Sequence, residues 1–552
     1  MKVDKLHIRS RFKNLENVLI EFDESHLMTV VVGRNGSGKS NVLEALVAIF
    51  RNLDLGEAPP FSYHMVYRLG QPPKPTKASE SWVEITIDAD PARGSLAKQY
   101  TISAVDLLQP RTTTLLGEES YSKIVPFSKV VRDKYGKSSY LPKYLFAYYS
   151  GPSDRLERHF KKHRNDFYRR LLEDKLDLKG DIRPLFYAKP HHSQFVLLAF
   201  FLSEQDSIEK SFLRDHLGIE GLDSIHFVMR QPGWAKKKGE LFWGARGVVR
   251  RFLDELIQHA LSPVKVTRQE DTSLTGSNIR NEFFHLFIPD LHALRNFAKG
   301  LSPDELFKML ESTLLSEIIS EVSIRVKVAS SKDPLTFREL SEGEQQLLTV
   351  LGLLKFTGGE DSLFLLDEPD THLNPSWAVK YLDFLRTFVP DHETSHLLMV
   401  THHPLAIAEL QKQQVQVMSQ DSNFQVTAQE PEDSPRGMGY AGILTSDMFG
   451  LRTTLDNSTE RLLRLRRKFT EKLELTHVET GRLKKIDQAL EGLGFSTVHW
   501  DEEYAKYLRA QREIERGLEP TNLSPDLHRI RNYRAREIIK KLVNTEQQGG
   551  RE

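Results

Sequence analysis

Apolar and polar residues alternate along the first part of the chain in a way that predicts strands. Residues 3–8 and 18–22 alternate, which is typical of half-buried strands. Leu27–Val32 is then almost continuously apolar, as in a buried strand, and a glycine-rich turn follows it. Beyond the turn, apolar residues recur at helical spacing, at Val42, Leu43, Leu46, Val47 and Phe50. The pattern predicts two strands followed by a strand, a loop and a helix.

Later residues add strands of the same two kinds. Residues 82–88 and 99–105 alternate and predict antiparallel strands beside the first ones. Residues 51–80 are predicted to be a loop, because Pro59-Pro60 and the prolines of 72–75 prevent regular pairing. Tyr144–Gly151 predicts a buried strand that ends in a turn.

A change of character after residue 154 predicts an insertion. Residues 156–334 show mostly helical spacing, with strand pieces near 283–288 and 322–328 and a polar loop at 264–282. The α/β pattern then returns, and helices dominate the last part of the chain. These shifts predict four segments: 1–155, 156–334, 335–435 and 436–552.

The composition is that of a soluble globular protein with more than one domain: 552 residues, 39% hydrophobic and 28% charged. The formal net charge is +0, so any nucleic-acid site must come from a local patch. The chain has no cysteine, which excludes disulfides and thiolate metal sites and is consistent with a reducing cytosol. The longest apolar runs are too short to span a bilayer, so we expect a cytoplasmic protein without a membrane partner.

The turn between the apolar strand and the helix has the chemistry of a phosphate-binding loop. Gly33–Ser40 reads G-x-x-x-x-G-K-S, and its glycines let backbone N–H groups converge at a helix N-terminus. Lys39 can reach the β- and γ-phosphates of ATP, and the Ser40 hydroxyl can ligate Mg²⁺. The predicted nucleotide contacts in this loop are Asn35, Gly36, Ser37, Gly38, Lys39, Ser40 and Asn41.

Two later strands end in residues that would complete an ATP site. The strand Leu363–Leu366 delivers Asp367 and Glu368 at its carboxyl end, where ligands sit in open α/β sheets. Asp367 is predicted to hold Mg²⁺, and Glu368 to polarise the water that attacks the γ-phosphate. His402 follows another strand and is placed to sense the γ-phosphate. Lys39, Glu368 and His402 are therefore the predicted catalytic residues.

A second anion-binding helix end is predicted at Ser341. Ser341, Gly343 and Glu344 open the buried helix that contains Leu347–Leu354. In a head-to-tail dimer, this helix end would meet the γ-phosphate bound by the partner subunit.

With these four motifs in order, the chain resembles the ABC-type ATPase heads of the SMC and RecF class. The resemblance covers residues 1–155 and 335–430, and Phe12-Lys13-Asn14 is similar to the F-R-N that opens RecF-like heads. It implies an α/β head, with a mixed sheet and added antiparallel strands, carrying a helical insertion and a helical C-terminal region. It also implies ATP and Mg²⁺ as cofactors and a head-to-tail dimer.

Three positions depart from that pattern. Glu342 stands where transporters usually have glycine, and Asn374 occupies the aspartate position of the D-loop. The strand that should end in the Q-loop glutamine ends instead in Tyr148-Tyr149-Ser150-Gly151. The sequence therefore leaves the Q-loop residue unassigned.

Shorter stretches resemble the PtuA family of ATPases, found in Septu and in some retron anti-phage systems. They are Tyr148–Gly151, Arg183–Tyr187 and Gly442–Leu451. The resemblance implies an HNH nuclease partner and, in retrons, a reverse transcriptase with its RNA–DNA hybrid. The alternative is a RecF- or SMC-like DNA-repair ATPase that acts directly on DNA.

Basic runs in the C-terminal region leave two interpretations open. Arg461–Lys468 and Arg529–Lys541 are basic, and Arg529, Arg536 and Lys540 would share one helix face. They would contact nucleic-acid phosphates or form salt-bridged exposed helices. No D-x-D pair follows His402, so we expect no nuclease site of the chain's own.

Overall fold

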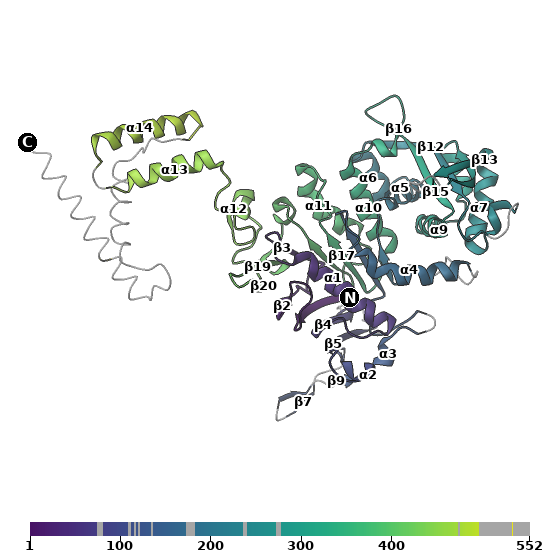
Figure 1. The fold of residues 1–552 in the computed structure, drawn as a ribbon, viewed down its shortest axis with the longest axis horizontal. Helices are drawn as coiled ribbons and strands as arrows, with labels where there is room; N and C mark the ends of the chain where they lie inside the picture. The colour runs from purple at the N-terminus through teal and green to yellow at the C-terminus, as the bar shows by residue number, and fades with distance from the viewer. Residues whose placement is uncertain are drawn as a thin grey trace, which may run out of the picture. The chain divides into compact units, whose positions relative to one another are not determined.

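A computed structural model places a seven-stranded sheet at the centre of the first compact unit (Figure 1). The structure describes residues 1–495 and Tyr533, except 74–80, 109–111, 115–116, 120–121, 134–135, 173–182, 236–239, 272–277 and 473–474. The strand order is β11 (Leu185–Tyr187), β10 (Tyr144–Tyr149), β17 (Ser362–Asp367), β18 (His396–Val400), β3 (Met28–Gly33), β19 (Val415–Gln420) and β20 (Val426–Gln429). All neighbours are parallel except β19 with β20. The carboxyl ends of β10, β17, β18 and β3 therefore meet at one edge.

Helix α1 (Lys39–Leu55) lies between this sheet and an antiparallel one. The second sheet has the order β2 (Val18–Glu21), β1 (Lys2–Ile8), β4 (Tyr63–Gly70), β5 (Trp82–Ala89), β6 (Tyr100–Asp106) and β9 (Ser122–Ile124). Leu46 of α1 belongs to the same buried cluster as Tyr67 of the antiparallel sheet and Leu365 of the central sheet. The predicted strand–loop–helix unit and the predicted antiparallel strands are confirmed.

The predicted loop over residues 51–80 is wrong at residues 51–55 and 63–70. Helix α1 continues to Leu55, and β4 occupies Tyr63–Gly70. Tyr63, Met65, Tyr67 and Leu69 alternate and face the core, while the residues between them are half-buried. The strand signal was present in the sequence, but the prolines on both sides obscured it.

The other face of the central sheet is covered by α5 (His192–Leu202), α10 (Glu342–Thr357) and α11 (Pro375–Phe388). Phe146 and Phe364 of the sheet share one buried cluster with Phe200 of α5 and with Phe227 of the insertion. The insertion thus shares the core of the head. Besides α5, its α-helices are α4 (Glu157–Leu172), α6 (Ile208–Asp215), α7 (Gly247–His259), α8 (Leu291–Phe297) and α9 (Pro303–Leu315).

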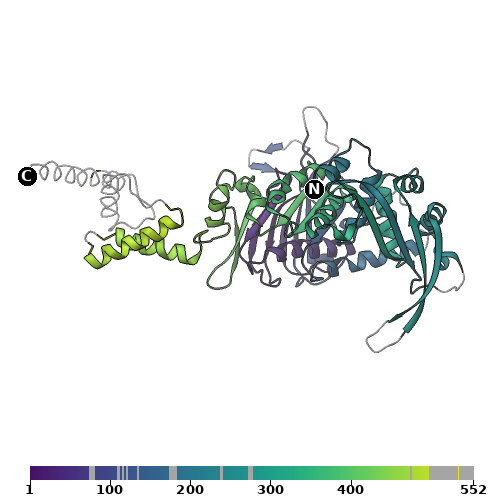
Figure 2. The same ribbon diagram turned by 90° about the horizontal axis from the view of Figure 1, so that it is seen from above.

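The expectation that residues 156–334 are mostly helical is corrected by a five-stranded antiparallel sheet. Its order is β13 (Leu261–Asp271), β14 (Asn278–Ile288), β12 (Ile219–Arg230), β15 (Ile319–Val328) and β16 (Leu335–Thr336). The predicted polar loop at 264–282 is largely the β13–β14 hairpin, whose teal strands extend from the sheet in Figure 2. Strand β13 lies at the exposed edge, so its polar residues look like a loop in the sequence.

Small elements complete the first compact unit, Met1–Leu451. They are α2 (Leu96–Gln99), α3 (Phe127–Val130), the hairpin of β7 (Thr112–Thr114) with β8 (Gly117–Glu119), and α12 (Gly439–Thr445). This unit extends past the predicted boundary at residue 435. No helix in the described ranges is long and apolar enough to cross a membrane.

The second unit, Arg452–Glu552, contains α13 (Asn457–Thr470) packed with α14 (His477–Gly492). On α13, Arg466 pairs with Asp487 at 2.6 Å, Arg467 pairs with Glu471 at 3.3 Å, and Arg464 pairs with Glu460. This first basic run therefore forms salt bridges on a partly exposed helix. The second run, with Arg529, Arg536 and Lys540, lies outside the described residues.

Candidate ATP site

Lys39 lies buried where β3 meets α1. Its Nζ donates hydrogen bonds to the carbonyl oxygens of Gly33 and Arg34, both at 2.9 Å. Burial lowers the pKa of Lys39 to about 8, against the opposing charges of Glu368 and Asp367. The ammonium is thus held in the curl of the loop, with no acidic side chain bonded to it among the described residues.

The N-terminus of α1 keeps its backbone donors for a ligand. Its cap residue is Gly38 at φ 94°, and no described side chain caps the helix. A Cβ at Gly38 would lie 2.7 Å from Leu15 Cδ2, so this close approach and the positive φ both require glycine. Helix N-termini without a side-chain cap are sites at which phosphate oxygens bind.

Asp367 and Ser40 place two oxygen ligands side by side. Ser40 Oγ donates to Asp367 Oδ1 at 2.8 Å, while the other carboxylate oxygen, Oδ2, is buried with no hydrogen-bond partner among the described residues. Burial raises the pKa of Asp367 to about 6. A hydroxyl next to an under-compensated carboxylate fits Mg²⁺, which prefers such hard oxygen ligands and would polarise the phosphate oxygens bound to it.

Glu368 is held in a strained backbone conformation beside His402. Its φ is 52°, which non-glycine residues rarely adopt. The amide of Glu368 donates to the carbonyl of Val400 at 2.9 Å, and its own carbonyl accepts from Thr371 Oγ1 at 2.8 Å. His402 Nε2 lies 3.4 Å from Glu368 Oε1. The constrained backbone directs the carboxylate toward His402.

The surroundings of His402 favour the neutral form of its imidazole. Burial and the charge of Lys39 lower its pKa, and Glu368 opposes them. A neutral imidazole beside a carboxylate can hold or pass one proton at this edge of the sheet.

Ser341 caps α10 in a complete capping box. Its hydroxyl accepts from the Glu344 amide at 3.3 Å, and Glu344 Oε2 accepts from the Ser341 amide at 2.7 Å. A Cβ at Gly343 would lie 2.5 Å from the carbonyl oxygen of His372, so α10 packs closely on the segment after Asp367. Ser341 itself is exposed.

Two family models match parts of this chain. The model "AAA ATPase domain" matches residues 1–125, and the model "AAA domain, putative AbiEii toxin, Type IV TA system" matches residues 247–408. The first range contains the phosphate loop, and the second contains Asp367, Glu368 and His402. Both matches support a P-loop ATPase head in this chain. The prediction of an ATP-hydrolysing enzyme with an α/β head is confirmed.

The ATPase also resembles a curated relative, as predicted. It is 25% identical over 200 residues to the Septu protein PtuA of Bacillus mycoides (strain KBAB4). The match covers 34% of this chain and only 28% of the relative's length.

Two solved SMC heads align with most of the chain at low similarity. The SMC head domain from Thermotoga maritima aligns over 78% of this chain and 100% of its own, with 13% identity and a TM-score of 0.27. The Smc head domain from Pyrococcus furiosus, solved with an extended coiled coil and bound to the C-terminal domain of ScpA, aligns over 78% and 96%, with 14% identity and a TM-score of 0.28. TM-scores this low support no inference.

The remaining predicted contacts of the ATPase fall into two groups. The hydroxyl of Ser37 is buried without a hydrogen-bond partner among the described residues, as a phosphate ligand would be. Asn41 instead uses its side chain within the protein: its Nδ2 donates to Asn14 Oδ1 at 2.6 Å. Asn14 Nδ2 in turn donates to the carbonyl of Gly36 at 2.9 Å, so Asn14 of the F-K-N stretch holds the phosphate loop.

Gln346 joins α10 to the residues that follow β17. The sequence analysis did not predict this role. Its Nε2 donates to the carbonyl of Glu368 at 3.3 Å, and its Oε1 accepts from the amide of His372 at 3.1 Å. Gln346 follows Ser341, Gly343 and Glu344 in the sequence, but only the fold shows that its side chain reaches Glu368. Gln346 therefore links α10, the helix that Ser341 caps, to the backbone of Glu368 and His372.

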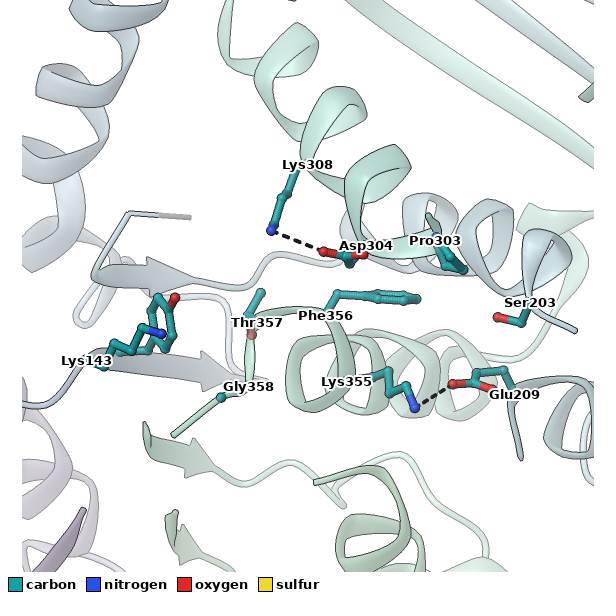
Figure 3. A pocket seen from close by; sticks show the side chains of 12 residues that line it. Lys143, Ser203, Glu209, Pro303, Asp304, Lys308, Lys355, Phe356, Thr357 and Gly358 are labelled. Atoms are coloured by element: carbon teal, nitrogen blue, oxygen red, sulfur yellow. Dashed lines mark hydrogen bonds and ion pairs between the residues drawn. The ribbon is translucent and has the colours of Figure 1, made fainter. Parts of the chain in front are cut away.

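In two other polar sites of the ATPase, charged side chains are already paired with one another. A cavity of about 380 Å³ opens at the amino-terminal side of β10 and β17 (Figure 3). Two of its lysines are paired, Lys355 with Glu209 at 2.8 Å and Lys308 with Asp304 at 3.2 Å.

His191, His192 and Glu311 lie close enough together to suggest a metal site. However, the amide of Lys189 donates to His192 Nδ1 at 2.8 Å, so Nε2 carries the ring proton and donates it to Glu311 at 2.7 Å. Arg183 occupies the other Glu311 oxygen at 2.7 Å. With its proton on Nε2 and both carboxylate oxygens taken, the cluster is a hydrogen-bonded network and not a metal site.

Proposed function

We propose that the ATPase binds ATP with Mg²⁺, dimerises head-to-tail, and uses the dimer to control a separate HNH-type nuclease in prokaryotic anti-phage defence. The Ser40–Asp367 pair, with Glu368 and His402 beside it, carries the ATP part of this proposal. The match to the Septu protein PtuA carries the defence part.

Each residue of the site has a distinct role in this proposal. The uncapped first turn of α1 and the Lys39 ammonium hold the phosphates. Ser40 and Asp367 hold Mg²⁺, which neutralises charge on the phosphates. Glu368 orients and deprotonates the attacking water, and His402 accepts or returns the proton.

Dimerisation accounts for the exposed end of α10. Ser341 is exposed and the side chain of Glu342 is 83% exposed, although this helix end is the predicted second anion-binding end. In a head-to-tail dimer, Ser341, Gly343 and Glu344 cover the γ-phosphate held by the partner subunit. Gln346 then transmits closure to Glu368.

The effect of Glu368→Gln tests the ATPase part. The amide cannot act as a base, so we expect kcat to fall about 10²–10³-fold while ATP binding persists. ATP should then trap a dimer, measured by sedimentation with and without Mg²⁺. Normal hydrolysis by Glu368→Gln would refute the assignment of Glu368.

Co-purification tests the defence part. Glu368→Gln expressed with its neighbouring genes and held with ATP should retain an HNH nuclease, identified by mass spectrometry. In a retron-type system it should also retain a reverse transcriptase and an RNA–DNA hybrid. Strong, salt-sensitive binding of duplex DNA by the protein alone, with no nuclease retained, would support the DNA-repair alternative instead.

A further inference from the structure

The segment between β10 and α4 occupies the place where the sequence offers no Q-loop glutamine. Strand β10 pairs with β17, and the amide of Ser150 donates to the carbonyl of Asp367 at 3.2 Å. Ser150 Oγ also lies 3.2 Å from Thr371 Oγ1. The segment therefore begins beside the carboxyl end of β17, and Arg155 follows Ser150 by five residues.

Arg155 bridges this segment to the first turns of α1. Its NH2 donates to Asn41 Oδ1 at 2.7 Å, and its Nε donates to Glu44 Oε2 at 3.2 Å. Its guanidinium also lies over the ring of Tyr149, 5.9 Å from the centroid. Asn41 is the neighbour of Ser40, so Arg155 is one residue removed from the predicted metal ligand.

Glu44 has more cations than its charge requires. The fully buried carboxylate also contacts Arg158 at 2.7 Å, His159 at 3.3 Å and Lys13. Removing Arg155 would still leave three cationic or hydrogen-bonding partners around Glu44. Neutralisation of Glu44 alone therefore does not explain why Arg155 also binds Asn41.

Helix α4 begins two residues after Arg155 and is bonded to the last turn of α1 and to Glu57 just beyond it. His163 bonds to Asp54 at 2.6 Å, and Lys162 bonds to Glu57 at 2.7 Å. On its other sides, α4 contacts β11, α7 and α9. A displacement of the first turn of α1 would thus reach the insertion through Arg155 and α4.

We propose that Arg155 is a positioning residue that couples nucleotide binding at Ser40 to a shift of α4, in place of a Q-loop glutamine. This inference rests on the proposed binding of ATP and Mg²⁺. Holding Mg²⁺ would replace the hydrogen bond between Ser40 and Asp367 and readjust the first turn of α1. Asn41 moves with that turn and carries Arg155 with it.

Hydrogen exchange of α4 with and without ATP and Mg²⁺ tests the coupling. The wild type should show an ATP-dependent change over Glu157–Leu172. Arg155→Gln should reduce this change at least fivefold and lower kcat about tenfold, with KM and the ATP Kd within threefold of wild type. Arg158→Gln is the matched control, because it removes a guanidinium from the same Glu44 without touching Asn41. It should keep the exchange response.

A second variant covers the case in which Arg155→Gln does not fold. Arg155→Lys keeps the positive charge beside Glu44 but lacks the planar fork, and it should recover less than half of the exchange response at an unchanged melting temperature. Equal losses in Arg155→Gln and Arg158→Gln, or full recovery by lysine, would overturn the proposal. If the wild type binds ATP but the hydrogen exchange of α4 does not change, the proposal is overturned, while the ATPase assignment stands. A wild type that binds no ATP refutes the proposed function itself.

Discussion

Asp367 and Glu311 are two buried carboxylates with opposite surroundings. Asp367 accepts one hydrogen bond from Ser40, its other oxygen has no partner among the described residues, and burial raises its pKa to about 6. Burial would also raise the pKa of Glu311, but His192 and Arg183 hold that pKa well below its usual range. Both oxygens of Glu311 are bonded within the fold, whereas Asp367 keeps one oxygen for a cation. A buried carboxylate with both oxygens bonded stabilises the protein, and one with an unbonded oxygen marks a place for a ligand.

Substitution at Glu311 should have the largest effect. Glu311→Ala leaves the buried Arg183 without its carboxylate, and we expect it to lower the free energy of unfolding by about 3–5 kcal/mol. Urea titration without nucleotide measures this. Asp367→Asn is the contrasting variant: it removes an under-compensated carboxylate, so the nucleotide-free protein should be as stable as wild type or more so. A similar loss in both variants would abolish the distinction between the two carboxylates.

The sequence predicted the Asp367 site better than the Glu311 network. Gly33–Ser40, Asp367 and Glu368 lie in contiguous motifs at strand ends, and parallel pairing of β3, β18 and β17 brings them together. The Glu311 network joins residues that are 128 and 119 positions apart in the chain. No local pattern encodes such distant partners, so only the fold shows them.

Physical reasons also explain why the sequence did not predict β13, β4 and the role of Arg155. Strand β13 carries polar residues because it is an exposed edge, and β4 sits between proline-rich stretches. Arg155 escaped notice because its partners Asn41 and Glu44 are on α1, 114 and 111 residues away. Helical spacing predicted α1 itself, but not which of its polar residues would be buried.

Lys39→Ala tests the Asp367 site directly. Loss of the ammonium should weaken ATP binding about a hundredfold, or ~2.7 kcal/mol, without lowering the melting temperature of the nucleotide-free protein. Isothermal titration calorimetry measures the affinity. Lys13→Ala is the control, because Lys13 pairs with Glu44 on the same helix, and its ATP affinity should stay within threefold. Equal losses in the two variants would mean that charge near α1, and not the phosphate loop, governs binding.

His191, which lies beside His192 and Glu311, gives the stability of the protein a pH dependence. Burial lowers the pKa of His191 from 6.5 to about 3. Between these two pH values the unfolded chain binds a proton at His191 and the folded protein does not. Stability from this group is full above pH 6.5 and is lost as the pH falls toward 3, by about 2 kcal/mol at pH 5. His191→Gln should lose that much less stability than wild type between pH 7 and pH 5 in urea titrations. His292→Gln, an exposed control on α8, should lose as much stability between pH 7 and pH 5 as wild type. The same loss in His191→Gln would show that burial does not shift the pKa of His191.

The smallest effect concerns two serines that cap helices in the same way. Ser302 caps α9 and Ser341 caps α10, each in a capping box with a glutamate three residues later. Either serine changed to alanine should cost about 1 kcal/mol of stability, because one backbone donor loses its acceptor. Only Ser341 is predicted to lie on the partner's γ-phosphate. In a Glu368→Gln background, Ser341→Ala should therefore weaken the ATP-dependent dimer at least tenfold in sedimentation, while Ser302→Ala leaves it within twofold. Equal dimerisation by both variants would confine Ser341 to a capping role and place the dimer contact elsewhere on the head.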